Sequence, residues 1–399
     1  MPFAVFVIFC AMLMALNAVA TDVMLPALPQ IGDDLGAPSP NDRQAVITAY
    51  LAGFGLGQFF MGALSDRFGR KPVLIAGLVG YVAGAALCAV AWDFPLFLGA
   101  RAAQGFGAAA PRVIVTALVR DCYAGRRMAQ VTSFAMMAFM AAPVLAPSIG
   151  QAVMIVATWD AIFWGLGGYG VLTLLIAVFA LPETLAREWR RPITLRGLGQ
   201  SAGMVLGSRQ TVGYAIASGV FFGALFGFIA SAQQILAELY GLGVWFPVVF
   251  GAVAAGIALA AFINALLVGR FGMRALSHGA VFLFTAISGA LATLAATQHP
   301  PLEVFLAMLW GAMMLVGLVF ANFNALAMEP QGRAAGVASS FIGGFTTLIG
   351  ATIGFFIGRA YDGTVLPLAL GYFACGAAAL VVLLITEKGR LFSLAPSPG

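Results

Sequence analysis

A single carboxylate stands within a long apolar segment near the start of the chain. Asp22 follows a run that is almost entirely apolar from residue 3 onward, and Leu25 and Leu28 continue the apolar pattern beyond it. An ionised carboxylate is costly in apolar surroundings, so this side chain is expected to exchange a proton or to bind a partner. The alternative is that Asp22 lies at a helix end beside Pro26 and stays in contact with water.

Two arginines and a glutamine occupy another apolar segment. Arg101, Gln104, Ala108 and Arg112 recur at spacings that bring them to one face of a helix with 3.6 residues per turn. That face must lie against protein or a water-filled cavity, because a guanidinium in contact with hydrocarbon is costly. Two cationic groups suit a neutral or anionic compound better than a lipophilic cation. For Arg112, bonds to helix ends or an extension toward the inner face are an equal alternative.

The composition shows what kind of chain must position these groups. Of 399 residues, 62% are hydrophobic and only 9% are charged, and the mean hydropathy is +1.00. Soluble domains carry about 25% charged residues, so these values exclude a soluble enzyme, a nucleic-acid-binding module and a disordered chain. The formal net charge of +5 comes from basic residues in short loops between apolar runs. The sequence therefore predicts an integral membrane protein.

Twelve apolar stretches are long enough to cross a bilayer as helices. They are Phe3–Leu25, Ala45–Leu64, Pro72–Trp92, Phe94–Val119, Met128–Ala152, Trp159–Leu181, Thr211–Ile235, Trp245–Leu267, Leu276–Thr297, Leu302–Asn324, Val337–Gly358 and Leu366–Ile385. Of the 20 Lys and Arg residues, only Arg43 and Arg359 fall on the outer side, and Arg101 and Arg112 fall within the fourth stretch. Because Lys and Arg gather in cytoplasmic loops, both termini are predicted to be cytoplasmic.

A polar stretch divides the chain into two similar parts. We predict an N-terminal six-helix bundle over residues 1–182, a cytoplasmic linker over 183–210 and a C-terminal six-helix bundle over 211–399. The strings Asp66–Lys71 and Gly269–Arg274 resemble each other and follow the second and eighth spans. Two similar membrane halves are typical of transporters that carry their site at the interface of the halves, near the middle of the bilayer.

The predicted topology brings the polar groups to similar depths. The fourth span runs inward from Asp93, so Arg101 lies about 10 Å below the outer face at 1.5 Å per residue. Asp22 lies within the first span, and we expect the two side chains to pair, since a buried Arg needs such a partner. Tyr50, near the outer end of the second span, is predicted to line the substrate cavity at the same depth, together with Asp22 and Arg112.

The loop between the second and third spans carries the most specific string in the chain. It reads Gly62-Ala-Leu-Ser-Asp66-Arg67-Phe-Gly69-Arg70-Lys71. We expect Gly62 to end a helix with close packing and Gly69 to permit a tight turn. Anchoring by positive charge alone would explain the basic residues, but not the acid and the two glycines in this order.

The fifth span contains two prolines. Pro143 and Pro147 each remove a helix hydrogen bond, so we expect this helix to bend and to serve as a gate. Gly-x-x-x-Gly steps in three spans allow close helix approach, which indicates packing rather than chemistry. They lie at Gly53 and Gly57, at Gly219, Gly223 and Gly227, and at Gly350, Gly354 and Gly358.

These strings together resemble the major facilitator superfamily, whose signature between spans two and three is G-x-x-x-D-R-x-G-R-R/K. Within it, the chain is similar to proton-driven drug exporters of the Bcr/CflA (bicyclomycin-resistance) group. The matching pieces are residues 20–29 around Asp22, residues 101–105, residues 117–121 ending in Arg120-Asp121, residues 142–150 and residues 333–340. The resemblance covers essentially the whole chain.

The resemblance implies an all-α membrane fold of twelve helices in two pseudo-symmetric six-helix halves. It also implies roles for residues that match the family's motifs. Asp22, Arg101 and Gln104 would take part in proton coupling. Gly62, Asp66, Arg67, Gly69, Arg70, Lys71 and Asp121 would form an inner-loop gate. Pro143, Pro147 and Gly150 would belong to an antiporter motif, from which this chain departs because Ala146 and Gln151 replace glycines.

Other kinds of chemistry find little support in the sequence. No G-x-x-x-x-G-K-S/T loop is present, so ATP is not expected to drive the protein directly. His278 and His299 stand alone at span edges, and no metal-like spacing of Cys or His occurs. We predict no cofactor, no metal, no catalytic residues and no nucleic-acid partner.

We predict a secondary transporter that exports drug-like amphipathic small molecules in exchange for protons, by alternating access. It would lie in the inner membrane of a bacterium as a monomer, with protons and a small-molecule substrate as partners. The alternative is a proton-coupled symporter that imports a sugar, an amino acid or another metabolite. Abundant Met and Phe, 16 and 33 residues, favour the exporter, because apolar and adaptable walls suit varied amphipathic compounds.

Overall fold

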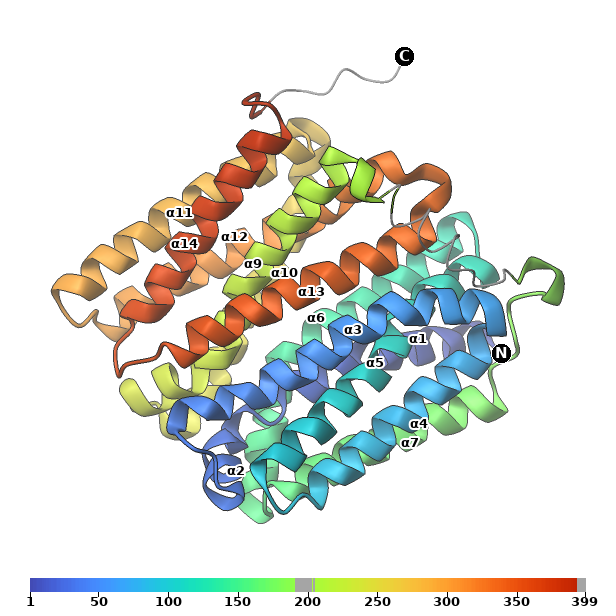
Figure 1. Cartoon of the computed structure of the whole chain (residues 1–399), viewed down its shortest axis with the longest axis horizontal. Helices are drawn as coiled ribbons and strands as arrows, with labels where there is room; N and C mark the ends of the chain where they lie inside the picture. The colour runs from blue at the N-terminus through green and yellow to red at the C-terminus, as the bar shows by residue number, and fades with distance from the viewer. Residues whose placement is uncertain (191–202, 204, 393–399) are drawn as a thin grey trace. The chain divides into compact units, whose positions relative to one another are not determined.

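The computed structural model describes residues 1–190, 203 and 205–392, without the side chains of residues 332–337. The described residues form helices joined by turns and loops and contain no β-strand. Twelve helical segments are long and apolar enough to cross a membrane, which confirms the predicted number. The fold is therefore an all-α membrane fold of twelve spans (Figure 1).

The chain forms two compact units, Met1–Gly199 and Gln200–Gly399, here called the N-terminal and C-terminal halves. The helices of the N-terminal half are α1 (Phe3–Asp22), α2 (Leu28–Leu35), α3 (Ala45–Phe68), α4 (Arg70–Ala89), α5 (Phe94–Cys122), α6 (Gly125–Val156) and α7 (Asp160–Phe179). Those of the C-terminal half are α9 (Arg209–Ala232), α10 (Phe246–Phe271), α11 (Met273–Thr297), α12 (Leu302–Met328), α13 (Ala335–Arg359) and α14 (Leu366–Thr386). Residues 191–202 and 204 of the predicted linker lie outside the described residues.

Several short elements connect these helices. They are the 3₁₀ turns Leu25–Ala27, Pro40–Gln44, Arg187–Trp189, Gly243–Trp245 and Glu329–Ala334, and a π-helical segment at Gln233–Leu239. Capping side chains fix several helix starts. Asp93 accepts the backbone N–H of Leu96 at 2.7 Å before α5, and Ser208 accepts that of Thr211 at 3.3 Å before α9. α5 ends beyond its predicted span at Cys122, and α9 begins before its predicted span at Arg209.

The first span is interrupted near its outer end. α1 ends at Asp22, the 3₁₀ turn Leu25–Ala27 follows, and α2 resumes at Leu28. Pro26 lies within that turn and has no N–H to donate, which explains the break in the helix. Asp22 thus lies at a helix end beside Pro26, as the alternative had it, but it is only 2% exposed, so the expected contact with water is wrong.

Glycines bring helix pairs into close contact, as the Gly-x-x-x-Gly pattern predicts. In the C-terminal half, α9 and α13 lie side by side, and Gly219, Gly223 and Gly227 face Ile349, Ile353 and Ile357 in turn (Figure 1). A Cβ at any of these glycines would come within 3.0 Å of the facing isoleucine. In the N-terminal half, a Cβ at Gly53 would lie 1.9 Å from the carbonyl oxygen of Ala102. The glycines therefore set how closely these helices approach.

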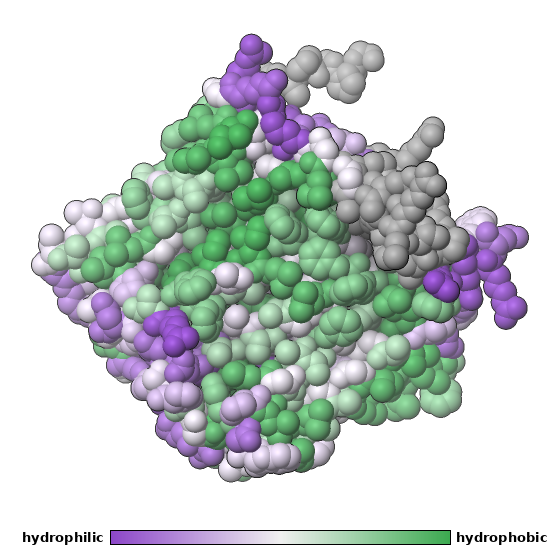
Figure 2. All heavy atoms as spheres, in the orientation of Figure 1, coloured by the Kyte–Doolittle hydropathy of each residue, from purple (hydrophilic) through white to green (hydrophobic). Residues whose placement is uncertain are grey.

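The surface carries the apolar side chains that a bilayer requires. On the face drawn in Figure 2, hydrophobic residues cover most of the helices and hydrophilic residues gather mainly near the helix ends. Exposed large side chains such as Phe60, Phe134, Phe262 and Phe356 belong to spanning helices. Surfaces of this kind are stable in lipid rather than in water.

Candidate functional site

Asp22 is the last residue of α1, and its side chain is buried. Its Oδ1 atom has no hydrogen-bond partner, and no ion pair with Asp22 occurs among the described residues. The neighbouring backbone is closely packed, because a Cβ at Gly150 of α6 would lie 1.8 Å from the carbonyl oxygen of Val23. A carboxyl group without partners, held at a fixed position in the interior, can change its protonation state without breaking a salt bridge.

Arg101 of α5 is the largest fully buried side chain of the described residues. Its guanidinium donates to Gln104 Oε1 at 2.7 Å and to the carbonyl oxygens of Ala20 at 3.1 Å and Val46 at 3.5 Å. It also lies over the ring of Tyr50, 4.4 Å from the ring centre. These contacts join α1, α3 and α5 around one permanent positive charge.

The expected ion pair between Asp22 and Arg101 is not formed. Arg101 reaches the backbone two residues before Asp22, where the carbonyl of Ala20 lies in the last turn of α1. Carbonyls in the last turn of a helix have no donor within the helix, so they can accept from a side chain. Gln104, predicted to act with this arginine, orients it by accepting its hydrogen bond. Backbone and amide dipoles thus solvate the charge that a carboxylate was expected to neutralise.

Tyr50 belongs to this cluster of Arg101 contacts and is fully buried. Its hydroxyl donates to Asn17 Oδ1 at 3.1 Å, and its ring stacks on Phe54 with the ring centres 6.4 Å apart. Asn17 lies on the same helix as Asp22, five residues before it. Its hydroxyl and ring face are engaged within the N-terminal half, so Tyr50 supports Arg101 in this structure.

Arg112 lies further along α5 in different surroundings. It is partly buried, its Nη1 atom is 3.7 Å from the sulfur of Met14, and its guanidinium lies 5.7 Å from the ring centre of Phe139. Pro111 precedes it within the helix. No carboxylate pairs with Arg112 among the described residues. The sequence offered bonds from Arg112 to helix ends as one alternative, and no such bond occurs among the described residues.

The two prolines of the predicted antiporter motif lie inside α6. That helix is continuous from Gly125 to Val156, with Pro143 and Pro147 in its interior. Pro147 and Gly150 are buried, and Gly150 allows α6 to approach the end of α1 next to Asp22. The motif therefore positions a helix against the backbone that carries the candidate proton-binding group.

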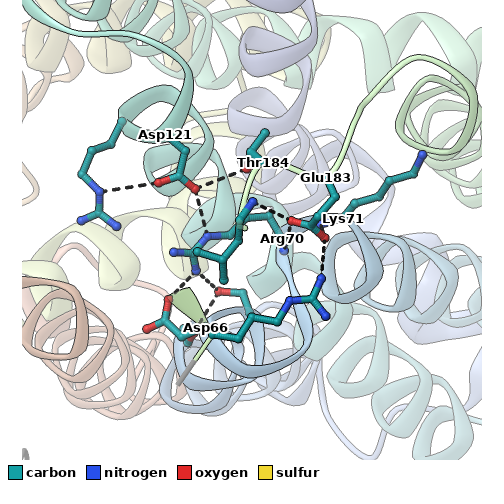
Figure 3. Close-up of polar contacts among 11 residues, drawn as sticks. Asp66, Arg70, Lys71, Asp121, Glu183 and Thr184 are labelled. Atoms are coloured by element: carbon teal, nitrogen blue, oxygen red, sulfur yellow. Dashed lines mark hydrogen bonds and ion pairs between the residues drawn. The ribbon is translucent and has the colours of Figure 1, made fainter. Parts of the chain in front are cut away.

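The inner loop folds around Arg70 (Figure 3). Arg70 is 4% exposed, and its Nη1 atom donates to Asp66 Oδ1 at 2.5 Å and to Ser65 Oγ at 2.7 Å. Its Nε atom donates to Asp121 Oδ2 at 3.2 Å, at the end of α5. Asp66, Arg70 and Asp121 thus form a salt-bridged cluster that joins α3, α4 and α5, and Thr184 adds a hydrogen bond to Asp121 at 3.3 Å.

Glu183 is a member of the inner cluster that sequence reasoning assigned only to the linker. Its carboxylate accepts the backbone N–H groups of Arg70 at 2.9 Å and of Lys71 at 3.3 Å, which are the first two residues of α4 (Figure 3). Negative charge at a helix N-terminus is stabilising, because the first N–H groups have no partner within the helix. Lys71 in turn donates from Nζ to the carbonyl oxygen of Val178 at 2.8 Å, near the end of α7.

The two glycines of the inner loop differ in their roles. Gly62 was expected to end a helix, and this prediction is wrong, because α3 continues through Gly62 to Phe68. No residue from 63 to 68 interrupts the helix, and the carbonyl of Gly62 accepts from Ser65 Oγ at 2.9 Å. Gly69 makes the predicted turn with φ of +105°, a value that favours glycine. Arg67 lies over the ring of Phe68, 5.1 Å from its centre.

The C-terminal half has its own cluster at the corresponding loop. Arg274, at the start of α11, donates from Nε to Glu387 Oε1 at 3.0 Å and lies 3.6 Å from Glu329 through Nη2. Tyr214 also donates to Glu387, at 2.6 Å. Burial acts to raise the pKa of the Glu387 carboxyl, but hydrogen bonds from Tyr214 and Arg274 outweigh it and hold the pKa below its usual value.

His278 is not the isolated residue at a span edge that the sequence suggested. It lies inside α11, fully buried, with Nε2 3.0 Å from the hydroxyl of Tyr214. Its Nδ1 atom accepts the backbone N–H of Phe392 at 3.4 Å. Among the described residues no group of three His, Cys, Asp or Glu side chains could hold a metal ion.

Comparisons with known proteins agree with this fold. Residues 8–355 match the Major Facilitator Superfamily. The chain is 31% identical over 352 residues to the Bacillus subtilis (strain 168) protein named uncharacterized MFS-type transporter YdgK, with 87% of each chain covered. It is 29% identical to the bicyclomycin resistance protein homolog of Haemophilus influenzae, with 93% of each chain covered. It is 28% identical to an Escherichia coli multidrug resistance protein, MdtL, with 96% of each chain covered.

A solved structure supports the architecture as a whole. The xylose transporter XylE from E. coli, in a partially occluded inward-open conformation, aligns with a TM-score of 0.74 over 98% of both chains. Its sequence identity of 13% makes this a likeness of fold alone. The family match and the twelve spans lead to one conclusion: the chain belongs to the Major Facilitator Superfamily and is a multi-pass membrane transporter rather than an enzyme.

Proposed function

We propose that this transporter exports drug-like amphipathic small molecules in exchange for protons, with Asp22 as the residue that binds the proton. The observation that carries the proposal is the buried Asp22 carboxyl, whose Oδ1 atom has no hydrogen-bond partner. An ionisable group in a membrane span is costly to retain unless it has a function. A carboxyl that pairs with no arginine can be protonated and deprotonated at the lowest structural cost.

The drug-like substrate is inferred from two relatives. The H. influenzae and E. coli proteins are named for bicyclomycin resistance and multidrug resistance, and each aligns over more than nine-tenths of this chain. Within the described residues, Met14 and Phe139 beside Arg112 provide an adaptable apolar environment of the kind that accepts varied compounds.

The proposed cycle uses Asp22 in two protonation states. With the transporter open to the cytoplasm, deprotonated Asp22 is present while substrate binds. The transporter then opens outward, the substrate leaves, and Asp22 takes a proton from outside. On return to the inward-open state, Asp22 releases this proton to the cytoplasm. Arg101, fixed by Gln104 and by the carbonyl of Ala20, keeps a constant positive charge close to the end of α1 throughout.

The remaining parts of the proposal concern the inner face and the setting. The cluster of Asp66, Arg70 and Asp121 acts as an inner-loop gate whose salt bridges hold one conformation. Both termini face the cytoplasm in the inner membrane of a bacterium, and the protein acts as a monomer. The distribution of Lys and Arg supports this orientation.

Inverted membrane vesicles with an acidified lumen and a pH-sensitive dye test the exporter. Phenicols, bicyclomycin-like compounds and lipophilic cations are added to wild type, to Asp22→Asn and to Asp33→Asn. Asp33 is the matched control, since its carboxylate is largely exposed and paired with Arg43 at 2.9 Å. A compound that dissipates the gradient in wild type and Asp33→Asn, but not in Asp22→Asn, is the expected result.

Two outcomes contradict the proposal. If a compound dissipates the pH gradient equally in wild type and in Asp22→Asn, Asp22 is not the residue that couples transport to protons. If no drug acts, while a sugar or an amino acid drives proton movement, the transporter is the symporter that the sequence left as the alternative.

A further inference from the structure

The two arginines on one face of α5 are satisfied to very different degrees. Arg101 is fully buried and makes three hydrogen bonds, one to an amide oxygen and two to backbone carbonyls. It also lies over the rings of Tyr50 and Phe163. Each of its three guanidinium nitrogens thus donates to the protein itself, and Arg101 has a structural explanation within the N-terminal half.

Arg112 has no comparable set of partners. A thioether sulfur is a weak acceptor, and the contact of Nη1 with Met14 at 3.7 Å is the single hydrogen bond that Arg112 makes to the described residues. The ring of Phe139 adds a cation–π contact at 5.7 Å. Arg112 takes part in none of the described ion pairs.

The position of Arg112 makes this lack of partners costly. α5 ends at Cys122, ten residues further on, so Arg112 lies about 15 Å from the inner end of the helix at 1.5 Å per residue. It lies about 16 Å from Arg101 along the same helix. A guanidinium stays charged in any protein environment, and at this depth in a span it needs an anion or water.

We propose that Arg112 binds the anionic group of the transported compound, so that the preferred substrates are amphipathic organic acids. This rests on the proposed function, because it assumes that the chain carries amphipathic small molecules. The planar guanidinium fork matches a carboxylate, which it binds through two parallel hydrogen bonds. The ring of Phe139 and the thioether of Met14 then contact the apolar body of the same molecule.

The charges of the N-terminal half favour an anion over a cation. Arg101 and Arg112 lie on one face of α5, whereas Asp22 is the single acid that the described part of this half buries within its spans. Once Asp22 is protonated, both remaining charges on this side are positive. A lipophilic cation would be repelled by them, and an amphipathic acid would neutralise one of them.

The test uses 4-(1-pyrenyl)butyrate and its primary amide, which share size and shape and differ in charge. Binding to purified protein in detergent is followed by pyrene fluorescence anisotropy at pH 7.5. The variants are Arg112→Gln, which removes the charge, Arg112→Lys, which keeps the charge without the fork, and Arg126→Gln as a control. Arg126 is an exposed arginine near the start of α6, so its removal changes only the net charge.

The wild type is expected to bind the acid at least tenfold more tightly than the amide. Arg112→Gln should weaken binding of the acid by about 10- to 100-fold and leave that of the amide unchanged. Arg112→Lys should fall between wild type and Arg112→Gln. Arg126→Gln should bind both compounds as wild type does.

Equal binding of the acid and the amide by wild type would overturn the proposal without any variant, so misfolding of Arg112→Gln cannot hide the answer. Binding of the acid that Arg112→Gln leaves intact would overturn it as well. Because binding is measured without a proton gradient, an Arg112-dependent preference for the acid can hold even if Asp22 proves unnecessary for coupling. The failure of one proposal is therefore distinguishable from the failure of the other.

Discussion

The inner loops of the two halves use the same kinds of groups in different arrangements. In the N-terminal half, Arg70 bridges Asp66 and Asp121, and Glu183 accepts backbone N–H groups at the start of α4. In the C-terminal half, Arg274 binds Glu387 and Glu329. The acid that follows the sixth span therefore caps a helix and pairs with Arg190, outside the loop string, whereas the acid that follows the twelfth span binds the arginine of the loop string itself.

This difference follows from two sequence positions. The second string has Gly269 in place of Asp66 and Met273 in place of Arg70, so its arginine, Arg274, stands at the position of Lys71. Arg274 therefore takes its partners from the end of α12 and from the residue after α14. A repeated loop can therefore place its arginine one position later and join a different set of helices through it. The inner loop of each half is therefore held by different acids: Asp66 and Asp121 bind Arg70, whereas Glu329 and Glu387 bind Arg274.

Arg70→Ala should have the largest effect on stability. It leaves the carboxylates of Asp66 and Asp121 without their common partner, and breaking a largely buried pair costs about 3 kcal/mol. Unfolding by titration with sodium dodecyl sulfate in mixed micelles measures this loss. Arg67→Ala, which removes an exposed arginine whose described contact is the ring of Phe68, should cost at most about 1 kcal/mol. Equal losses for the two variants would show that the cluster contributes no stability.

Glu387→Gln should destabilise the C-terminal half by about 2 kcal/mol at pH 7. Because the pKa of Glu387 is lowered in the folded protein, its contribution is complete above the ordinary pKa of a glutamate and is lost as the pH falls through the lowered value. Between about pH 6 and pH 3, the free energy of unfolding should therefore fall less steeply with decreasing pH for Glu387→Gln than for wild type. Glu303→Gln, at the exposed start of α12, should keep the wild-type slope. An unchanged slope in Glu387→Gln would contradict the assignment.

Gly69→Ala and Gly272→Ala form a matched pair, and we expect the difference in their free energies of unfolding to be smaller than the effects above. Both glycines have positive φ values, +105° and +78°, so alanine is strained at each by about 1–3 kcal/mol. A Cβ at Gly69 would also lie 2.2 Å from Glu183 Oε2, whereas a Cβ at Gly272 would meet nothing within 4 Å. Gly69→Ala should therefore cost about 1 kcal/mol more, as the loss of a helix cap does.

The same detergent titration measures both glycine variants, and Glu183→Ala provides the control. In the Glu183→Ala background the obstructing carboxylate is gone, so Gly69→Ala should cost as much as Gly272→Ala. A difference that persists without Glu183 would assign the extra cost to the backbone of the loop instead of to the cap.

Most of the fold could be predicted from hydropathy, and the helix ends could not. The predicted fifth span, Met128–Ala152, is part of a longer helix, Gly125–Val156. Hydropathy reports the part of a helix that lies in hydrocarbon, but the backbone hydrogen bonds continue into the polar region on both sides. The break between α1 and α2 was visible only as Pro26, which the apolar residues around it obscured.

The residues of the site were easier to find than their partners. Asp22 and Arg101 were recognisable as costly charges, since composition makes each charged side chain in a span conspicuous, and Arg70 was found from the loop string. The partner of Arg101 is a backbone carbonyl, and every residue has one, so no residue type could indicate Ala20. Glu183 had a signal that was overlooked. An acid follows the last helix in both halves, at Glu183 and Glu387, and the repeat could have identified both.

The regular contact between α9 and α13 has a mechanical consequence. Three glycines spaced by one turn receive three isoleucines with the same spacing, and Phe222 and Phe226 pack against Gly350 and Gly354 in return. A sliding motion shorter than a full turn would drive side chains into backbone at several points at once. α9 and α13 therefore move together as one rigid unit. Any bending of the C-terminal half during a transport cycle has to take place at its other helix contacts.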